Sequence, residues 1–203
     1  MWPEDVPIVR CHDVSWGSRE FYAGSTRNRS RFSPFVARGR RKPLPVLYGA
    51  DDQAGALSET IFHDLPASGP AKHVPYAKLL HAQLIELRPL RDLTLIDLTS
   101  DGLSRLGLTR SQLIESDPRS YPETAGWARV LHDHLIHPDG LYWVSRQHDT
   151  SRCFVLFSDR VKRANLAVAP KSLPLPLAIG AGFDIVCEAA DRAGITITGI
   201  PGL

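Results

Sequence analysis

Three side chains in the first third of the chain, Arg31, Tyr48 and Glu59, are of types that together can bind and cleave a phosphorylated sugar. An arginine guanidinium presents a planar fork of donors that matches phosphate oxygens. A fixed carboxylate stabilises positive charge that grows beside it, and it can also hold sugar hydroxyls. A tyrosine ring stacks on planar groups while its hydroxyl donates a hydrogen bond. Each residue also has an ordinary explanation: a surface arginine, a core tyrosine in a strand and a solvated glutamate.

A short strand and the helix after it are the elements expected to position the tyrosine and the glutamate. Residues 46–50 form a compact apolar run, which predicts a strand with the tyrosine at its centre. Asp51 or Asp52 can then cap a helix over 53–64. Glu59 lies off the apolar stripe of that helix, a position that suits a functional carboxylate and a solvated one equally well.

The rest of the chain predicts a mixed α/β fold. Segment 13–45, rich in Ser, Arg, Gly and Pro, predicts loops, and 66–75 predicts a linker. The remaining pattern predicts strands over 79–87, 94–98, 141–145, 154–157 and 166–168, short helices after Ser100 and Thr109, longer helices over 122–136 and 178–193, a turn at 138–140 and a β-rich end at 195–200. Strands and helices interleave without strict βαβ order, so we expect one domain over 1–203 with a central mixed sheet flanked by helices.

The order of three short motifs resembles the RES domain, a family named for an Arg, a Glu and a Ser. The motifs are Ser30-Arg31-Phe32-Ser33-Pro34, then Val46-Leu47-Tyr48-Gly49-Ala50, then Ala56-Leu57-Ser58-Glu59-Thr60. The glutamate stands eleven residues after the tyrosine, as the family pattern has it. The resemblance covers roughly residues 8–160, with 178–200 as an extension.

The resemblance implies further site residues. Ser145, at the end of a predicted strand, is the best match for the family serine, and Thr124 is a second hydroxyl candidate. Arg10 matches an arginine near the N-terminus, although Cys11 follows it where some family members have an aromatic residue. His63 follows the glutamate by four residues, so it is expected to share its helix face and to line the pocket.

The resemblance also implies a function: an enzyme that consumes NAD+, with a fold related to ADP-ribosyltransferases. Cleaving the nicotinamide–ribose bond develops positive charge on the ribose, which Glu59 would stabilise. Arg31 and Arg10 would bind the pyrophosphate. The acceptor is water, inorganic phosphate as a co-substrate, or a protein side chain, the last giving protein ADP-ribosylation; the sequence leaves these open. Family members are typically toxins paired with Xre-type helix-turn-helix antitoxins, so such a partner is expected here too.

A basic segment gives the competing hypothesis. Residues 27–42 contain no acid and hold Arg27, Arg29, Arg31, Arg38, Arg40, Arg41 and Lys42. Either neighbour in the same loop, Arg27 or Arg29, can take the place assigned to Arg31. A non-catalytic module docking nucleic acid through this segment would show affinity that falls steeply with salt. The net charge of only +2 and the lack of interleaved aromatics in 36–45 count against it, so no direct nucleic-acid contact is expected.

The remaining composition favours a cytoplasmic protein. Three cysteines far apart in sequence fit a reducing compartment better than a disulfide framework. Neither a secretory signal nor an apolar run long enough to span a bilayer is visible. His132, His134 and His137 lie on one predicted helix, and a polar helix face explains them better than a metal site, so no metal is expected.

Overall fold

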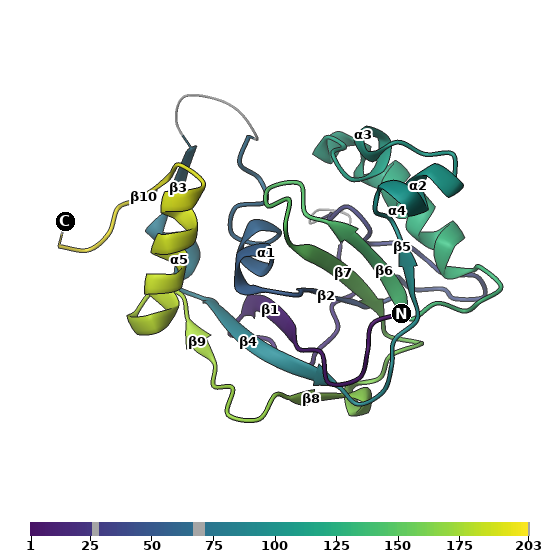
Figure 1. Ribbon diagram of the computed structural model, residues 1–203, viewed down its shortest axis with the longest axis horizontal. Coiled ribbons are helices and arrows are strands. Elements are labelled where there is room, and N and C mark those ends of the chain that lie inside the picture. Colours follow the sequence, from purple (N-terminus) through teal and green to yellow (C-terminus); the bar gives the residue numbers. More distant parts are fainter. Residues whose placement is uncertain (26–28, 67–71, 203) are drawn as a thin grey trace.

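A curved sheet forms the centre of the molecule (Figure 1). The computed structural model describes residues 1–25, 29–66 and 72–202. The strands of the central sheet are β1 (Ile8–Asp13), β2 (Val46–Ala50), β4 (Ala82–Pro89), β5 (Leu95–Asp97), β6 (Gly140–Val144), β7 (Arg152–Phe157), β8 (Leu166–Val168) and β9 (Leu175–Pro176). Their order is β5–β6–β7–β2–β1–β4–β8, and β9 also pairs with β4. Only β5 and β6 run parallel among these pairs, so the sheet is mixed and the predicted fold class is confirmed.

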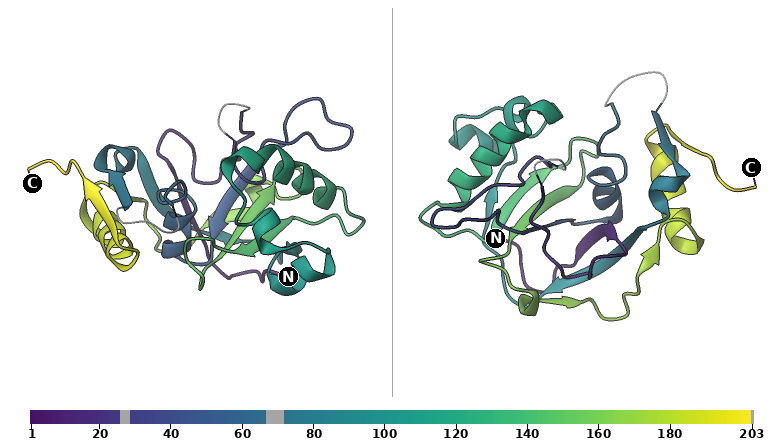
Figure 2. Two further views of the ribbon diagram at one scale, coloured as in Figure 1. Left: turned by 90° about the horizontal axis from the view of Figure 1, so that it is seen from above. Right: turned by 180° about the vertical axis from the view of Figure 1, so that it is seen from behind.

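The helices lie at both ends and over the middle of the concave sheet face. They are α1 (Gln53–Ser58), α2 (Ser100–Arg105), α3 (Arg110–Leu113), α4 (Tyr121–His132) and α5 (Gly180–Arg192), with single turns of 3-10 helix at Tyr76–Leu79, Pro118–Ser120 and Arg163–Asn165. In Figures 1 and 2, α2, α3 and α4 gather at one end, while α5 lies at the other beside a small parallel sheet of β3 (Lys72–Pro75) and β10 (Ile195–Thr198). Within the described part of the chain, no helix combines the length and the apolar character needed to cross a bilayer.

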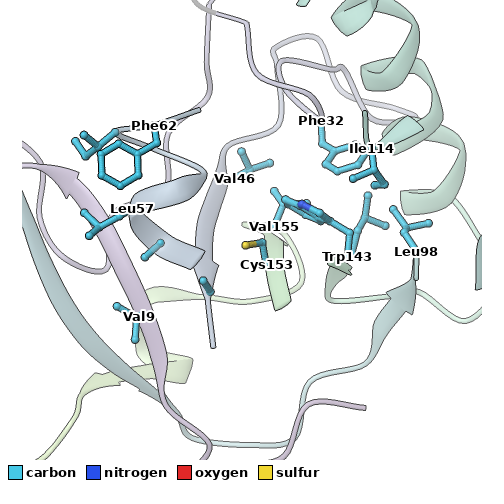
Figure 3. Close-up of a cluster of buried hydrophobic side chains, with 14 of the residues drawn as sticks. Val9, Phe32, Val46, Leu57, Phe62, Leu98, Ile114, Trp143, Cys153 and Val155 are labelled. Atoms are coloured by element: carbon cyan, nitrogen blue, oxygen red, sulfur yellow. The ribbon is translucent and has the colours of Figure 1, made fainter. Parts of the chain in front are cut away.

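Apolar side chains alternate between two cores, one on each sheet face, because successive residues of a strand point to opposite sides. Val46 packs into the core beneath the helices, and the next residue, Leu47, packs into the core on the opposite face. The helix-side core is centred on Trp143, whose ring meets that of Phe32 edge-on with centroids 5.0 Å apart (Figure 3). This packing anchors the loop that carries Arg31 directly beneath the helices.

The predicted helix over 53–64 is right at its start and wrong at its end. Asp52 caps it, accepting a 2.6 Å hydrogen bond from the Gly55 amide. The helix ends at Ser58, because the Leu57 carbonyl then accepts hydrogen bonds from several successive amides and the chain turns. Glu59 is therefore the C-cap of α1 and not a residue of a long helix face.

Other boundaries also differ from the predictions. The helix predicted over 122–136 ends at His132, and the strand predicted from residue 79 begins at Ala82 after a 3-10 turn. The linker predicted over 66–75 is wrong for Lys72–Pro75, which pairs with β10; 67–71 lie outside the described residues. Strand β1 was not predicted, because Arg10, Cys11, His12 and Asp13 interrupt its apolar pattern, yet it pairs with β4 along its whole length.

Candidate active site

A cavity of about 360 Å³ opens between the sheet, the 29–33 loop and the turn after α1. Five of the seven residues predicted for the site line it: Arg10, Arg31, Tyr48, Glu59 and His63. The other two, Ser145 and Thr124, are buried behind the wall and hydrogen-bond to residues that line the cavity. The tertiary structure thus brings together residues that span most of the chain.

Glu59 is held by three donors from two segments that are far apart in sequence. The Ser145 hydroxyl donates a 2.8 Å hydrogen bond to its Oε1, and the Arg146 amide donates to the same oxygen at 3.3 Å. Arg31 Nη1 donates to Oε2 at 3.2 Å. Burial alone would raise the pKa of Glu59, but the charges of Arg31 and His63 and the bond from Ser145 outweigh it, and the pKa lies below its ordinary value. Glu59, whose side chain is 10% exposed, is therefore a largely buried carboxylate that is ionised at neutral pH.

Arg31 is buried but only partly paired. The residue is 2% exposed, and Nη1 makes the ion pair with Glu59. Nε and Nη2 have no hydrogen-bond partner among the described residues. The Thr124 hydroxyl donates to the backbone carbonyl of Arg31, which fixes the loop against the first turn of α4. Both nitrogens are closed to solvent, yet Arg31 lines the cavity. Buried polar groups are normally satisfied, so two unpaired donors on this residue point to an anionic ligand.

Tyr48 positions the arginine loop. Its hydroxyl accepts a hydrogen bond from the Phe32 amide at 3.2 Å and shares a 2.9 Å hydrogen bond with Ser30. Burial raises the pKa of Tyr48 to about 12, so the phenol remains protonated. Its ring forms part of the cavity wall, where a planar group can contact it, while its hydroxyl clamps the residues on either side of Arg31.

Arg10 lies on β1 and faces the same cavity. Its Nη1 donates to the Ser18 carbonyl at 2.6 Å and to the Gly17 carbonyl at 3.5 Å. Burial lowers the pKa of Arg10 to about 10, which leaves the guanidinium charged at neutral pH. Arg29 also lines the cavity and is exposed, whereas Arg27 lies outside the described residues.

His63 lines the cavity although it is not on the same helix as Glu59. Its Nε2 lies 3.1 Å from the Tyr121 hydroxyl, and its Nδ1 lies 3.1 Å from Asp64 Oδ1. The guanidinium of Arg146 donates to the His63 carbonyl at 3.0 Å. The contacts made by Arg146 could not be predicted from the sequence, because they depend on a backbone amide and on a long-range approach. The only sequence signal for this residue is its place next to Ser145.

The loop that carries Ser145 is tied to both ends of α1. At the start of the helix, the Ser151 hydroxyl donates to the capping carboxylate of Asp52 at 2.7 Å. The Ser145 amide donates to the Ser151 carbonyl at 2.9 Å, which closes the loop. At the other end, Ser145 binds Glu59 as described. One short helix therefore sets the distance between the carboxylate and the serine.

The three histidines near the end of α4 do not share a helix face. His132 is buried, with its two ring nitrogens 2.8 Å from Asp133 Oδ1 and 3.1 Å from Asp159 Oδ2. His134 and His137 are exposed and lie beyond the end of the helix. The prediction of a polar helix face is therefore wrong for His132, which packs between Phe35 and Phe157. Among the described residues, no group of His, Cys, Asp and Glu side chains is arranged to hold a metal ion.

Comparisons with known proteins found a matching family model and a solved structure of similar fold. The family model described as the RES domain matches residues 7–178, which is most of the chain. The crystal structure of the M. tuberculosis MbcT–MbcA toxin–antitoxin complex contains a chain of similar fold, with a TM-score of 0.59 and 19% identity over 87% of each chain. No curated protein matches this sequence.

Proposed function

Because this chain belongs to the RES-domain family, we propose that it is the toxin of a toxin–antitoxin pair and that it acts by degrading NAD+. The observation that carries the proposal is the pairing, in one cavity wall, of ionised Glu59 with a buried Arg31 that keeps two donors free. Cleavage of a dinucleotide at its ribose is favoured by a carboxylate that stabilises the charge on the ribose and by a nearby cation that binds the phosphates. The fold shared with one chain of a toxin–antitoxin complex supports the toxin role.

Glu59 supplies the electrostatic part of the mechanism. Breaking the bond between ribose C1′ and the nicotinamide nitrogen releases neutral nicotinamide and leaves positive charge on the ribose. The ionised carboxylate stabilises that charge as it develops, and its own partial burial strengthens the interaction. Ser145 holds one carboxylate oxygen and Arg31 the other, so the group does not need to reorient during the reaction.

The arginines supply binding of the pyrophosphate. Arg31 Nε and Nη2 are the free donors, and the exposed Arg29 lines the same wall. Thr124 and Tyr48 fix the backbone on either side of Arg31, so the guanidinium is positioned before the ligand arrives. Arg10 adds a third positive charge, although its Nη1 is engaged by backbone carbonyls.

Analysis of the reaction products must identify the acceptor of the ADP-ribosyl group. Attack of water oxygen on C1′ gives ADP-ribose, nicotinamide and a proton. Attack of a phosphate oxygen gives the ADP-ribose phosphate ester and nicotinamide, with inorganic phosphate consumed. Transfer to a protein side chain gives nicotinamide and a modified protein. All three break the same bond, and we propose degradation, with water or phosphate as acceptor, over transfer to protein.

The direct test measures the products formed from NAD+ by the purified protein, with and without phosphate and with and without added protein acceptors. We expect stoichiometric nicotinamide and soluble ADP-ribose or its phosphate ester. Glu59→Gln keeps the shape and hydrogen-bonding capacity but removes the charge, and it should lower the rate by at least 100-fold. Glu123→Gln, an exposed position on α4, is the matched control. Full NAD+ turnover by Glu59→Gln would refute the mechanism.

We propose that the partner is a small antitoxin of the Xre helix-turn-helix class, encoded beside this gene. Expression of this chain alone should deplete cellular NAD+ and stop growth, and co-expression of the neighbouring small protein should restore both. Growth arrest without NAD+ loss would separate the toxin role from the proposed activity. Unimpaired growth together with NAD+ turnover in vitro would instead contradict the toxin role.

A further inference from the structure

Two exposed aromatic side chains lie side by side, and one of them lines the cavity. Trp16 is 41% exposed and Tyr22 is 40% exposed, and their rings meet edge-on with centroids 5.2 Å apart. Tyr22 is part of the cavity lining. Large aromatic rings gain most from burial, so an adjacent pair that remains half in solvent beside a cavity is a ready contact surface for a planar ligand.

This aromatic pair sits on a segment that is fixed in place. Arg10 binds the carbonyls of Gly17 and Ser18, between the two aromatic residues. The backbone of Tyr22 pairs with that of Val46 through two hydrogen bonds of 2.8 Å each. The pair is therefore attached to β1 through Arg10 and to β2 through Val46. A platform already held in position binds a ligand with little loss of conformational entropy.

The pair lies at the opposite end of the cavity from the carboxylate. Tyr22 pairs with Val46, at the start of β2. Ser145, which holds Glu59, pairs instead with Ser151. Ser151 lies beyond the residue that pairs with Ala50, at the end of β2. Val46 and Ala50 are about 13 Å apart along an ideal strand, given a rise of about 3.3 Å per residue. Between the two ends, the wall is formed by side chains that include Ser30, Arg31 and Tyr48.

The wall therefore presents an aromatic platform, then cationic donors, then a carboxylate. A dinucleotide presents the matching groups in the same order: a base, a pyrophosphate and the second ribose. We propose that Trp16 and Tyr22 form the stacking site for the adenine ring of NAD+. This inference rests on the proposed NAD+ substrate. It gives the aromatic pair the role of selecting a dinucleotide over nicotinamide mononucleotide.

Steady-state kinetics test the assignment through four variants: Trp16→Ala, Tyr22→Ala, Trp16→Phe and Tyr22→Phe. Losing a stacking partner weakens binding of a base by roughly 5- to 100-fold. The alanine variants should raise KM for NAD+ by such a factor with kcat unchanged, because the platform is remote from the reacting bond. The phenylalanine variants keep a ring and should stay near wild type. Nicotinamide mononucleotide, which lacks adenine, should be used equally well by all five proteins.

A binding measurement separates this inference from the activity on which it rests. AMP should quench the fluorescence of Trp16, and the quench should disappear in Trp16→Phe. The other three tryptophans are the unquenched background: Trp2 and Trp143 are buried, and Trp127 packs partly buried against the helix-side core. Nicotinamide mononucleotide should give no such quench. If AMP quenches Trp16 while the wild-type protein leaves NAD+ intact, the base site stands and the proposed reaction is wrong.

Three results would overturn the adenine site. One is an unchanged KM for NAD+ in both alanine variants. Another is an equal loss toward NAD+ and nicotinamide mononucleotide, which would place nicotinamide and not adenine on the platform. The third is the absence of AMP quenching in a folded wild-type protein. Thermal melting of each variant checks that it is folded. We expect the variants to fold, because the backbone pairing of Tyr22 with Val46 does not depend on the tyrosine ring.

Discussion

Ser145 and Glu59, 86 residues apart in sequence, are joined by a 2.8 Å hydrogen bond from the serine hydroxyl to Oε1 of the carboxylate. The serine follows β6, and the glutamate ends α1, so the bond connects two elements that reach the cavity from different directions. The same oxygen also accepts the Arg146 amide. The carboxylate is consequently aimed by the fold and not by the rotamer preference of an exposed side chain.

Removing that hydrogen bond should slow the reaction without unfolding the protein. A hydrogen bond to a charged group contributes about 1.5–3 kcal/mol, so Ser145→Ala should lower kcat for nicotinamide release by roughly 10- to 100-fold. Thr150→Ala, an exposed hydroxyl in the same loop, is the matched control and should retain wild-type kcat. A Ser145→Ala enzyme with unchanged kcat would show that Arg31 and the Arg146 amide suffice to orient Glu59.

The ion pair with Arg31 should set the acidic limit of activity. The positive charge of Arg31 helps hold the pKa of Glu59 below the ordinary value. Wild-type activity is therefore lost only as pH falls through that lowered pKa. In Arg31→Gln the effect of burial prevails, the pKa of Glu59 rises, and the acidic limb of kcat/KM for NAD+ moves to higher pH. The pH profile of nicotinamide release measures this shift.

Arg29→Gln tests whether a neighbouring cation shares that role. Arg29 lines the same cavity but is exposed, and Glu59 pairs with Arg31 instead. We expect the acidic limb of Arg29→Gln to coincide with that of wild type. An equal shift in both variants would mean that the whole basic loop, and not the buried pair, controls ionisation of Glu59.

Two glycine-to-alanine substitutions should have opposite effects on stability. A Cβ atom at Gly55 would lie 2.6 Å from Ser151 Cβ, so Gly55→Ala must separate α1 from the Ser145 loop and should cost about 1–3 kcal/mol of unfolding free energy. Gly126, inside α4, has open space at that position, and Gly126→Ala should stabilise by about 0.5–1 kcal/mol. Denaturant unfolding compares them; a neutral Gly55→Ala would show that the loop has room to shift.

His132 should make stability depend on pH in the direction opposite to a carboxylate. Burial alone would lower the pKa of His132, but the hydrogen bonds and charges of Asp159 and Asp133 outweigh it and raise the pKa above its ordinary value. Its contribution is complete below the unfolded-state pKa of about 6.5 and is lost as pH rises through the higher folded-state pKa. The unfolding free energy lost in His132→Gln should therefore be largest at mildly acidic pH and shrink at alkaline pH. A loss that grows with pH would contradict this sign.

The local parts of this site follow from residues that are neighbours in the chain. The apolar run at 46–50 forms β2 with Tyr48 at its centre, and Asp52 caps the following helix, because short-range propensity and capping depend on neighbouring residues. The spacing from Tyr48 to Glu59, together with the Arg31 motif, was enough to indicate the family. These features needed no knowledge of the rest of the fold.

Tertiary packing, by contrast, established which residues meet and how. It ended α1 at Ser58, brought Arg31 and Ser145 to the carboxylate of Glu59, and joined Thr124 to Arg31 across 93 residues of sequence. It also made a strand of Ile8–Asp13, whose sequence lacks a strand pattern, because β2 and β4 pair with it on both sides. Such long-range contacts depend on packing of the whole sheet, which is why no local pattern indicated that Tyr22, in contact with Trp16, would line the cavity.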